Sequence, residues 1–404
     1  MTKCADENEA RSFNVAIIGC GRVGEREASA VISIPGLRLV AVSDIGPAFR
    51  HKALHLAETY ECDVVHDWRH LVTRRDVDIV VVSTPNSFHK NISIEAMRHG
   101  KHVVCEKPLA TTLDDAAQML LTAQAQGVKL ITNFNHRLHD HNVRAKEILD
   151  QGLIGRPVFI RGRIGHGRFI VGPSPAGPGR FQCQETWYLD AKQAGGGTVI
   201  DNGVHLLDLA RWFMGDEFVE VQGTVTRNLD LCVSQHNGIR AFNKQVECED
   251  NGFGLFKTAD GRIAALHSSW VQWNGYLYLE IFGTRGSIVI DNDQIQGHVS
   301  YHVFDHHGAP LRQTVEIPAL LQPDPSWKRQ LQELVAAIKE NRDPSPNGYD
   351  GLQTLRMVHA LYKSAELSKA QRIDTSRPQM KRKSAARHKE LEGKALGRFA
   401  QANP

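Results

Sequence analysis

The residues best suited to chemistry lie in the segment VIDNGVHLLDLARWF, residues 199–213. Asp201 and His205 are four residues apart, so on a helix they share one face, with Asp208 three residues further along the same stripe. Histidine titrates closest to neutral pH, so this stripe suits proton transfer. Taken alone, it is better explained by a solvated helix face, or by a histidine that caps a neighbouring backbone group.

Lys107 is a second candidate, because it follows the apolar run KHVVCE and precedes a proline. Oxidation of an alcohol requires its proton to leave as hydride departs, and a cation in a partly dehydrated cleft stabilises the developing alkoxide. The alternative is an ordinary surface lysine. Pro108 argues against that alternative, because a proline fixes the loop that aims the side chain.

The segment AIIGCGRVG carries Gly19, Gly21 and Gly24 between an apolar run and a helix-compatible stretch. This spacing is typical of a dinucleotide site, in which a tight turn and a helix N-terminus face a pyrophosphate. Asp44 follows the next apolar run, about 20 residues further on, where an acid binds ribose hydroxyls and repels a 2′-phosphate. We therefore expect NAD rather than NADP. A glycine turn in an unrelated α/β protein, with Asp44 as a plain loop acid, is the alternative.

Elements that position these residues follow a βαβ rhythm from Phe13 onward. Short Val- and Ile-rich runs alternate with helix-compatible segments, which predicts an α/β fold with a Rossmann parallel sheet buried on both faces. Thr112, with Asp115 three residues on, predicts a helix start, and Gly127 predicts its end.

Beyond Arg156 the pattern changes to a Gly- and Pro-rich stretch, residues 162–180, which predicts a long loop. Extended runs joined by ADG, residues 259–261, predict a hairpin in an α+β domain with a mainly antiparallel sheet. Two late helical segments cover that sheet or return to the first domain. The expected domains are a dinucleotide-binding Rossmann domain, an α+β substrate and oligomerisation domain, and a basic tail, at residues 12–135, 136–376 and 377–404.

Several separate motifs, in order, resemble the GFO/IDH/MocA family of glucose-fructose oxidoreductase, inositol dehydrogenase and rhizopine catabolism proteins. They are Thr84-Pro85 with His89, the triplet Glu106-Lys107-Pro108, NFNHR at 133–137, the glycines 195–197 and the segment DNGVHLLD. The resemblance runs from about residue 13 to 370. The chain departs from the family after NFNHR, where RLHDHN stands in place of the usual aromatic residue and proline.

The resemblance implies that Lys107 contacts the hydroxyl being oxidised and that Asp201 and His205 complete the catalytic group. His205 is then the general base, and Asp201 orients it or binds a sugar hydroxyl. The peptide bond before Pro108 is often cis in this family. The expected cofactor-binding residues are Gly19, Gly21, Arg22, Val23, Gly24, Asp44, Thr84, Pro85, Asn86, His89, Glu106 and Lys107. The expected substrate-binding residues are Asn135, Arg137, Arg163, Arg168 and Trp187.

Five arginines and no acid lie between residues 156 and 180, at positions 156, 161, 163, 168 and 180. Arginine favours phosphate or carboxylate, which suits a nucleotide sugar or a uronic acid. A basic strand and loop in a dimer interface explains them equally well. GHG, ETWYLD, EDN and HSSWVQW are similar to segments of family members associated with surface-polysaccharide sugars, which favours the nucleotide-sugar-like branch by analogy only.

Composition limits the remaining classes. The 404 residues contain no secretory signal and no apolar run long enough for a membrane span, so we expect a cytoplasmic protein. Seven scattered cysteines without a C-x-x-C pair argue against a disulfide framework and against structural zinc. The spacings of His136, His139 and His141 with Asp140, and of His302 with residues 305–307, match no standard metal site.

The sequence therefore predicts an NAD-dependent dehydrogenase acting on a secondary hydroxyl of a sugar, sugar nucleotide or cyclitol. The alternative is a catalytically inactive NAD-binding sensor or regulatory protein of the same fold. After residue 376 there are eight Lys or Arg against two Glu, but the rest of the chain lacks a nucleic-acid motif, so nucleic-acid binding is not expected. An antiparallel sheet with one bare face predicts a homo-oligomer.

Overall fold

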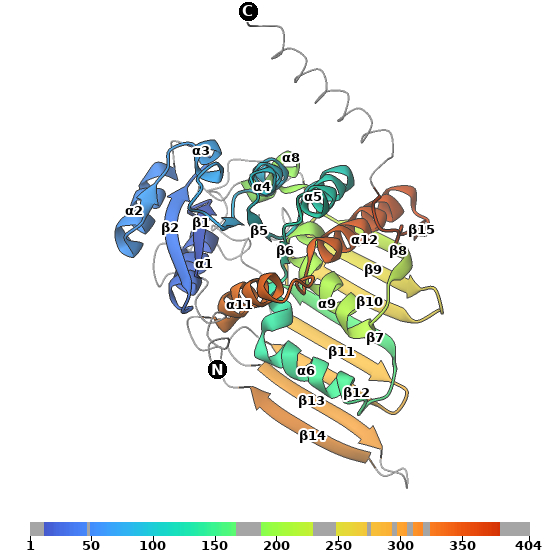
Figure 1. Cartoon of the computed structure of the whole chain (residues 1–404). Helices are drawn as coiled ribbons and strands as arrows, with labels where there is room; N and C mark the ends of the chain where they lie inside the picture. Colours follow the sequence, from blue (N-terminus) through green and yellow to red (C-terminus); the bar gives the residue numbers. More distant parts are fainter. Residues whose placement is uncertain are drawn as a thin grey trace, which may run out of the picture.

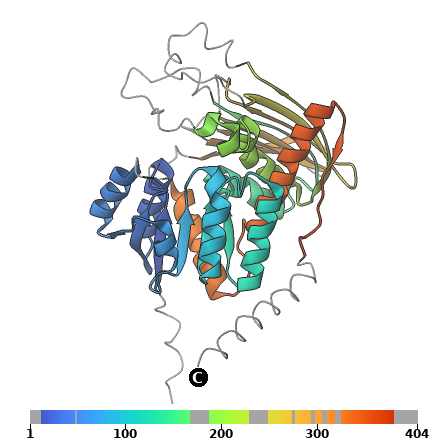
Figure 2. The ribbon, with the colours of Figure 1, turned by 90° about the horizontal axis from the view of Figure 1, so that it is seen from above.

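A computed structural model of the chain describes residues 12–46, 49–166, 187–228, 248–272, 276–292, 297–304, 310–317 and 324–379. They form two lobes, each built on one β-sheet (Figures 1 and 2). Among these residues no helix is both long and apolar enough to cross a membrane.

The first lobe is a six-stranded sheet in the order β3-β2-β1-β4-β5-β6, and all of its strand pairs are parallel. Its strands are β1 (Phe13–Ile18), β2 (Leu37–Ser43), β3 (Asp63–Val64), β4 (Ile79–Val82), β5 (His102–Glu106) and β6 (Leu130–Asn133). Its helices are α1 (Arg22–Ile32), α2 (Arg50–Tyr60), α3 (Trp68–Val72), α4 (His89–Arg98) and α5 (Leu113–Gln126). Every residue of β4 is buried, as expected for a strand covered on both faces.

Local signals placed helix α5 correctly. The Thr112 hydroxyl accepts a hydrogen bond from the Asp115 amide at 3.2 Å, and Gly127 ends the helix in the left-handed conformation. This helix packs beside α4 on one face of the parallel sheet.

The second lobe is a nine-stranded sheet in the order β14-β13-β12-β11-β7-β10-β9-β8-β15. Only β7 and β10 pair in parallel, so the predicted mainly antiparallel sheet is confirmed. Its strands are β7 (Pro157–Gly165), β8 (Phe218–Thr226), β9 (Asn251–Thr258), β10 (Ile263–Ser269), β11 (Leu277–Gly283), β12 (Gly286–Asn292), β13 (Gly297–Phe304), β14 (Pro310–Ile317) and β15 (Gln371–Arg372). The predicted ADG hairpin joins β9 to β10, with Gly261 at φ +91°.

One face of this sheet is covered by helices α6 (Asp140–Asp150), α9 (Val204–Met214) and α12 (Gly348–Leu367), as Figure 1 shows. Strand β9 alternates buried and exposed positions, so its outward side chains lie on the opposite face. Phe253 and Leu255 on that face are 44% and 56% exposed.

Helix α11 (Pro325–Lys339) returns to the first lobe, where it packs against α1. Trp327, Leu331 and Leu334 join the apolar cluster that contains β1. Helix α12 instead lies along β8 of the second sheet and contacts α5. The two late helices therefore serve different lobes.

The long loop expected over residues 162–180 differs from expectation at its start. The stretch expected to be a loop from residue 162 continues as strand β7 up to Gly165, because its backbone pairs with β10 on one side and with β11 on the other. The rest of that stretch, including Arg168 and Arg180, lies outside the described residues, as do residues 305–307 and the tail beyond residue 379.

Candidate active site

A cleft of about 170 Å³ lies between the two lobes, at the carboxyl ends of the parallel strands. The first lobe contributes Arg22, Val23, Arg26, Ser83, Thr84, Asn86, Glu106 and Lys107. The chain that follows contributes Asn135, His136, His166, Trp187, Tyr188, Asp201, Asn202, His205, Tyr276 and Trp327. Residues expected to bind the cofactor and residues expected to do chemistry therefore share one space.

The glycine loop at the mouth of this cleft is tightly packed on one side and open on the other. A Cβ on Gly19 would approach the Ser83 carbonyl carbon to 2.5 Å, and one on Gly24 would approach the Gly19 oxygen to 2.0 Å. A Cβ on Gly21 would meet no atom within 4 Å. Gly21 caps α1 without a side-chain hydrogen bond, so the helix N-terminus is open to an anion, as a dinucleotide requires.

Asp44 lies at the end of β2, beside this loop. One carboxylate oxygen accepts a hydrogen bond from the Cys20 amide and the other from the Ile45 amide, both at 2.7 Å. The carboxylate also borders a small hollow of about 100 Å³, lined in part by Arg50 and His66. Burial raises the pKa of Asp44, and the two amides oppose that rise. A carboxylate fixed at this edge suits the hydroxyls of an adenosine ribose.

The Thr84–Pro85 segment follows β4 and closes one side of the cleft. The Thr84 hydroxyl is buried and has no hydrogen-bond partner among the described residues, while Asn86 donates to the Ala194 oxygen at 2.8 Å. His89 is fully buried and does not line the cleft. Its ring nitrogens contact the Pro108 and Thr84 oxygens at 2.8 and 2.9 Å, so it braces the two loops that surround the cleft instead of contacting cofactor directly.

Glu106, the last residue of β5, faces the cleft from a buried position. Asn133 donates to Glu106 and, at 3.1 Å, to the fully buried Glu27 of α1. Burial raises the pKa of Glu106 to about 7, against the lowering effect of Lys107. Burial, with the charge of Glu106 nearby, also raises the pKa of Glu27 well above its usual value. Burial therefore raises the pKa of both acids beside the glycine loop.

Lys107 joins the two lobes. Its Nζ donates to a carboxylate oxygen and to the main-chain oxygen of Asp201, both at 2.9 Å. The other carboxylate oxygen of Asp201 accepts from Trp270 Nε1 at 3.2 Å. The Lys107–Pro108 peptide bond is cis, as the resemblance implied. The amine thus lies in the cleft, paired with the acid expected to act beside it.

His205 lies near the start of α9 and is 6% exposed. Its ring stacks on the ring of His136, with centroids 3.8 Å apart and planes 10° apart. Burial lowers the pKa of His205 well below its usual value, and the charge of Lys107 acts in the same direction. Nδ1 of His205 has no hydrogen-bond partner among the described residues. Asp201 is therefore not bonded to that nitrogen, contrary to one of its two expected roles.

Asp201 and His205 share the helical face that their spacing predicted, although the backbone differs from a regular helix. Residues Val199–Gly203 form a short π-helix, η5, and α9 continues from Val204. Glu249 holds the start of η5, accepting from the amides of Gly197 and Val199 at 2.8 and 3.0 Å. Close packing requires the glycine here, because a Cβ on Gly197 would lie 1.9 Å from the Glu249 oxygen.

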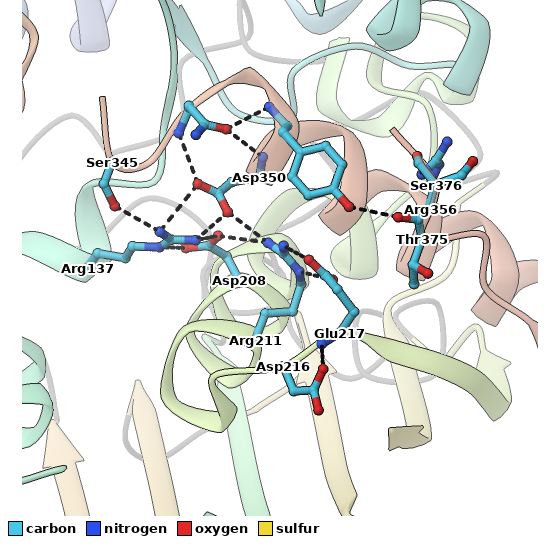
Figure 3. Close-up of polar contacts among 12 residues, drawn as sticks. Arg137, Asp208, Arg211, Asp216, Glu217, Ser345, Asp350, Arg356, Thr375 and Ser376 are labelled. Atoms are coloured by element: carbon cyan, nitrogen blue, oxygen red, sulfur yellow. Dashed lines mark hydrogen bonds and ion pairs between the residues drawn. The ribbon is translucent and has the colours of Figure 1, made fainter. Parts of the chain in front are cut away.

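Asp208 and Arg137 depart from expectation. Asp208 is buried away from the cleft, where Arg137 Nε donates to it at 2.7 Å (Figure 3). Arg137 and Arg211 also pair with Asp350 of α12, at 3.2 and 3.1 Å. Arg137 does not line the cleft. The substrate contact expected of it is corrected to an ion pair that fastens α9 to its neighbours.

The other expected substrate residues divide into three groups. Asn135 and Trp187 line the cleft, and the Trp187 ring stacks on Tyr188 with centroids 3.8 Å apart. Arg163 lies on the bare face of the second sheet, over the Tyr278 ring, so its expected substrate contact is also corrected. Arg168 lies outside the described residues.

No role in the reaction was expected for His136, although it belongs to the NFNHR segment and lines the cleft; its spacing was weighed only for metal binding. In the described part of the chain, no group of three or more His, Cys, Asp or Glu side chains is arranged to hold a metal ion. Tyr276, Trp327, His166 and Asn202 were missed as well. They come from loops and helix starts far apart in sequence, and no periodicity connects them.

Comparison with known proteins agrees with this geometry. The family model described as "Oxidoreductase family, NAD-binding Rossmann fold" matches residues 13–134, and the GFO/IDH/MocA C-terminal domain matches residues 142–289. The chain belongs to the GFO/IDH/MocA family of oxidoreductases. It is an NAD-dependent enzyme of that family.

Two curated relatives cover most of the chain. The 1,5-anhydro-D-fructose reductase of Ensifer adhaerens is 31% identical over 76% of this chain and 82% of its own length. The inositol 2-dehydrogenase of Rhizobium meliloti (strain 1021) is 26% identical over 86% of this chain and 95% of its own length. The solved structure of levoglucosan dehydrogenase with NADH and levoglucosan has a TM-score of 0.78 at 24% identity, covering 90% of this chain and all of that one. This likeness confirms the fold.

Proposed function

We propose that the enzyme transfers hydride between NAD and a secondary hydroxyl of an uncharged sugar-type or cyclitol substrate, bound between Lys107, Asp201 and His205. The observation that carries this proposal is the Lys107–Asp201 pair, 2.9 Å apart, which brings an amine of the first lobe and an acid of the second to one cleft with His205. Bound NAD supplies the hydride acceptor at its nicotinamide.

Each of the three residues has a distinct task in the proposed reaction. His205 takes the hydroxyl proton, because burial keeps its ring neutral and able to accept. The Lys107 ammonium stabilises the oxygen as negative charge develops on it. Asp201 holds that ammonium in place and offers its carboxylate to a neighbouring hydroxyl of the substrate.

The lining of the cleft supports an uncharged ring as substrate. Trp187, Tyr188 and Tyr276 provide aromatic surface, while Asn135 and Asn202 provide amides for hydroxyl groups. In the described part of the chain, Arg161 and Arg163 lie on the bare sheet face and Arg156 pairs with Asp260, so none of these three reaches the cleft. Relatives named for anhydrofructose, inositol and levoglucosan support the same class, in preference to a nucleotide sugar.

Two wider expectations remain part of the proposal. A homo-oligomer forms through the bare face of the second sheet, where Phe253 and Leu255 are exposed around a hollow of about 730 Å³. The cytoplasm is the proposed location. An inactive NAD sensor is the alternative function, and the presence of all three catalytic candidates in one cleft argues against it.

The proposal is tested with Lys107→Ala and His205→Gln. Both variants are expected to retain NAD binding, since the glycine loop and Asp44 are untouched: His205→Gln with unchanged affinity, and Lys107→Ala within about tenfold, the loss of one cofactor contact. The kcat with any accepted polyol should fall at least about a hundredfold, as loss of acid–base catalysis or of charge stabilisation predicts. A panel of inositols, anhydrosugars, uronic acids and nucleotide sugars identifies the substrate by NADH absorbance.

Lys90→Ala is the matched control, because Lys90 pairs with Asp115 on the far side of α4 and does not line the cleft. Its kcat should equal that of the wild type. Wild-type rates in both test variants, or NAD binding without turnover of any polyol by the wild type, contradict the assignment. The second result favours the sensor.

A further inference from the structure

His136, in the NFNHR segment, lies against the proposed base, and the sequence predicted no role in the reaction for it. We propose that His136 is a positioning residue, whose ring fixes the plane of His205 and keeps that imidazole neutral and ready to accept the hydroxyl proton. This inference rests on the proposed function. It adds a residue to that reaction and assigns the orienting task to a stacked ring instead of a carboxylate.

Within the described part of the chain, the orientation of the His205 ring is set by stacking and not by a hydrogen bond to Nδ1. A general base usually has its second ring nitrogen fixed by a hydrogen bond to an acceptor, commonly a carboxylate. Here Nδ1 of His205 has no hydrogen-bond partner among the described residues, and the Asp201 carboxylate is bound to Lys107 and Trp270. The parallel ring of His136 at 3.8 Å, and the edge of Phe134 at 6.3 Å, are what hold the His205 plane.

Burial and the charged groups around the stacked rings of His136 and His205 keep both rings neutral. Lys107 faces His205 from the end of β5, Asp201 from η5, and His139 from the residue after η3 (Asn135–Leu138). His139, His141 and Lys107 also act on His136, and the Tyr276 hydroxyl lies 3.5 Å from His136 Nε2. Only Asp201 among these favours a cation, and it is paired with Lys107. Burial lowers the pKa of His136 well below its usual value. Both rings are therefore neutral before reaction.

The stacked pair of rings also suits the transfer of the hydroxyl proton to His205. The hydroxyl O–H bond breaks and its proton passes to a ring nitrogen of His205, while the electron pair of the C–H bond leaves as hydride to NAD and the carbon–oxygen double bond forms. His205 becomes an imidazolium over the π face of a neutral ring, which attracts it. A charged His136 would repel it at 3.8 Å, so the stack accommodates one proton and not two.

Three variants separate the effect of stacking from that of structure. His136→Phe keeps a stacked, buried ring that cannot titrate. His136→Ala removes the ring and admits water to His205, and His136→Gln keeps a polar side chain without a ring. Exposed His99, on the far end of α4, provides the control His99→Gln.

The first readout is the pH profile of kcat/KM for polyol oxidation. Activity rises as the base loses its proton, so a lowered pKa of His205 places the acid limb below the ordinary histidine range. With Ala or Gln the limb should move upward by about 0.5 to 1 pH unit, toward the unperturbed value near 6.5, because water reaches the ring. With Phe the limb should stay within about 0.3 unit of the wild type, and kcat should exceed that of the Ala variant.

The second readout needs no substrate. The ring of His205 is followed by NMR in protein with ¹³C-labelled histidine and assigned by its loss in His205→Gln. The pKa of His205 measured in this way should rise in His136→Ala and His136→Gln and stay nearly unchanged in His136→Phe. An unmoved titration in all three variants overturns the role of His136, even if turnover confirms the enzyme. A shifted titration in a chain that oxidises no polyol supports the stack while refuting the proposed function.

Circular dichroism checks that each variant is folded. A shift in Phe equal to that in Ala overturns the stacking argument, because it assigns the effect to lost polarity. If His136→Ala does not fold, His136→Phe and His136→Gln still have different expected results, little change and an upward shift of the pKa of His205. His99→Gln should leave both readouts at wild-type values.

Discussion

Asp201 links groups from both lobes, and this position determines how it acts. Its carboxylate binds Lys107 from the first lobe and Trp270 from the second sheet. A residue with both oxygens engaged in this way sets the position of the Lys107 amine. In the proposed reaction Lys107 and His205 have separate tasks, so their contributions to the rate are expected to be separable.

Asp44 provides the prediction at the residue scale. Asp44→Ser removes the negative charge beside the glycine loop, so it should weaken NAD and relieve repulsion of a 2′-phosphate. The ratio of kcat/KM for NAD to that for NADP should fall by roughly tenfold, the loss of about one charged hydrogen bond. Parallel assays with the two cofactors measure this ratio.

Cys20 offers the control for this change, because its amide binds Asp44 while its side chain is buried against the Ser43 oxygen. Cys20→Ala keeps the amide and should keep the ratio. An unaltered ratio in Asp44→Ser would mean that ribose recognition lies elsewhere.

At the scale of elements, helix α9 depends on a buried ion network. Arg137, Arg211, Asp208 and Asp350 meet beside the helix (Figure 3), and none of them lines the cleft. The network joins the segment before α6, helix α9 and helix α12. Because Asp208 lies one turn after His205, this attachment fixes the helix that carries the proposed base.

Removal of one partner of this network should be costly. Arg137→Met leaves Asp208 buried without its main partner, and we expect a loss of about 3–5 kcal/mol in the free energy of unfolding. The double variant Arg137→Met with Asp208→Leu should recover part of that loss, because no uncompensated charge remains. Urea denaturation followed by circular dichroism measures both.

Arg69→Met is the comparison, since Arg69 and Asp67 form an exposed pair. Its cost should stay below about 1 kcal/mol. A loss in Arg137→Met no larger than in Arg69→Met would contradict the buried network as a source of stability.

Elements were predicted best where one local rule decides the outcome. The Val- and Ile-rich runs, the Thr112 cap, Gly127 and the ADG turn each depend on neighbours within a few residues. Helical spacing and motif selected His205, Asp201 and Lys107, and the structure places all three in one cleft. Arg137 was misassigned and His136 was missed for the same reason: their partners lie on distant elements, so the sequence does not distinguish a cleft residue from the one beside it.

At the scale of the whole molecule, the bare sheet face is the surface proposed to bind a second copy of the chain. Leu255→Lys places a charge at the most exposed apolar position of β9. We expect it to shift the proposed homo-oligomer toward monomer, because an unpaired charge in an interface core is costly. Sedimentation velocity at several concentrations measures the shift.

Leu54→Lys, on helix α2 of the first lobe, is the matched control, because Leu54 is also an exposed leucine, at 43%. It should leave the sedimentation coefficient unchanged. A wild-type monomer, or an undisturbed dimer in Leu255→Lys, would place self-association on another surface or remove it.

The return of α11 has a consequence for how the polypeptide is divided. A fragment that stops at residue 135 keeps all six parallel strands but loses Trp327, Leu331 and Leu334 from its own apolar interior. It would expose to water the side of α1 that α11 covers, directly behind the glycine turn. The nucleotide-binding half is therefore completed by residues translated almost two hundred positions later, and the newly made chain cannot finish this half until strands β7 to β14 of the other sheet have been synthesised.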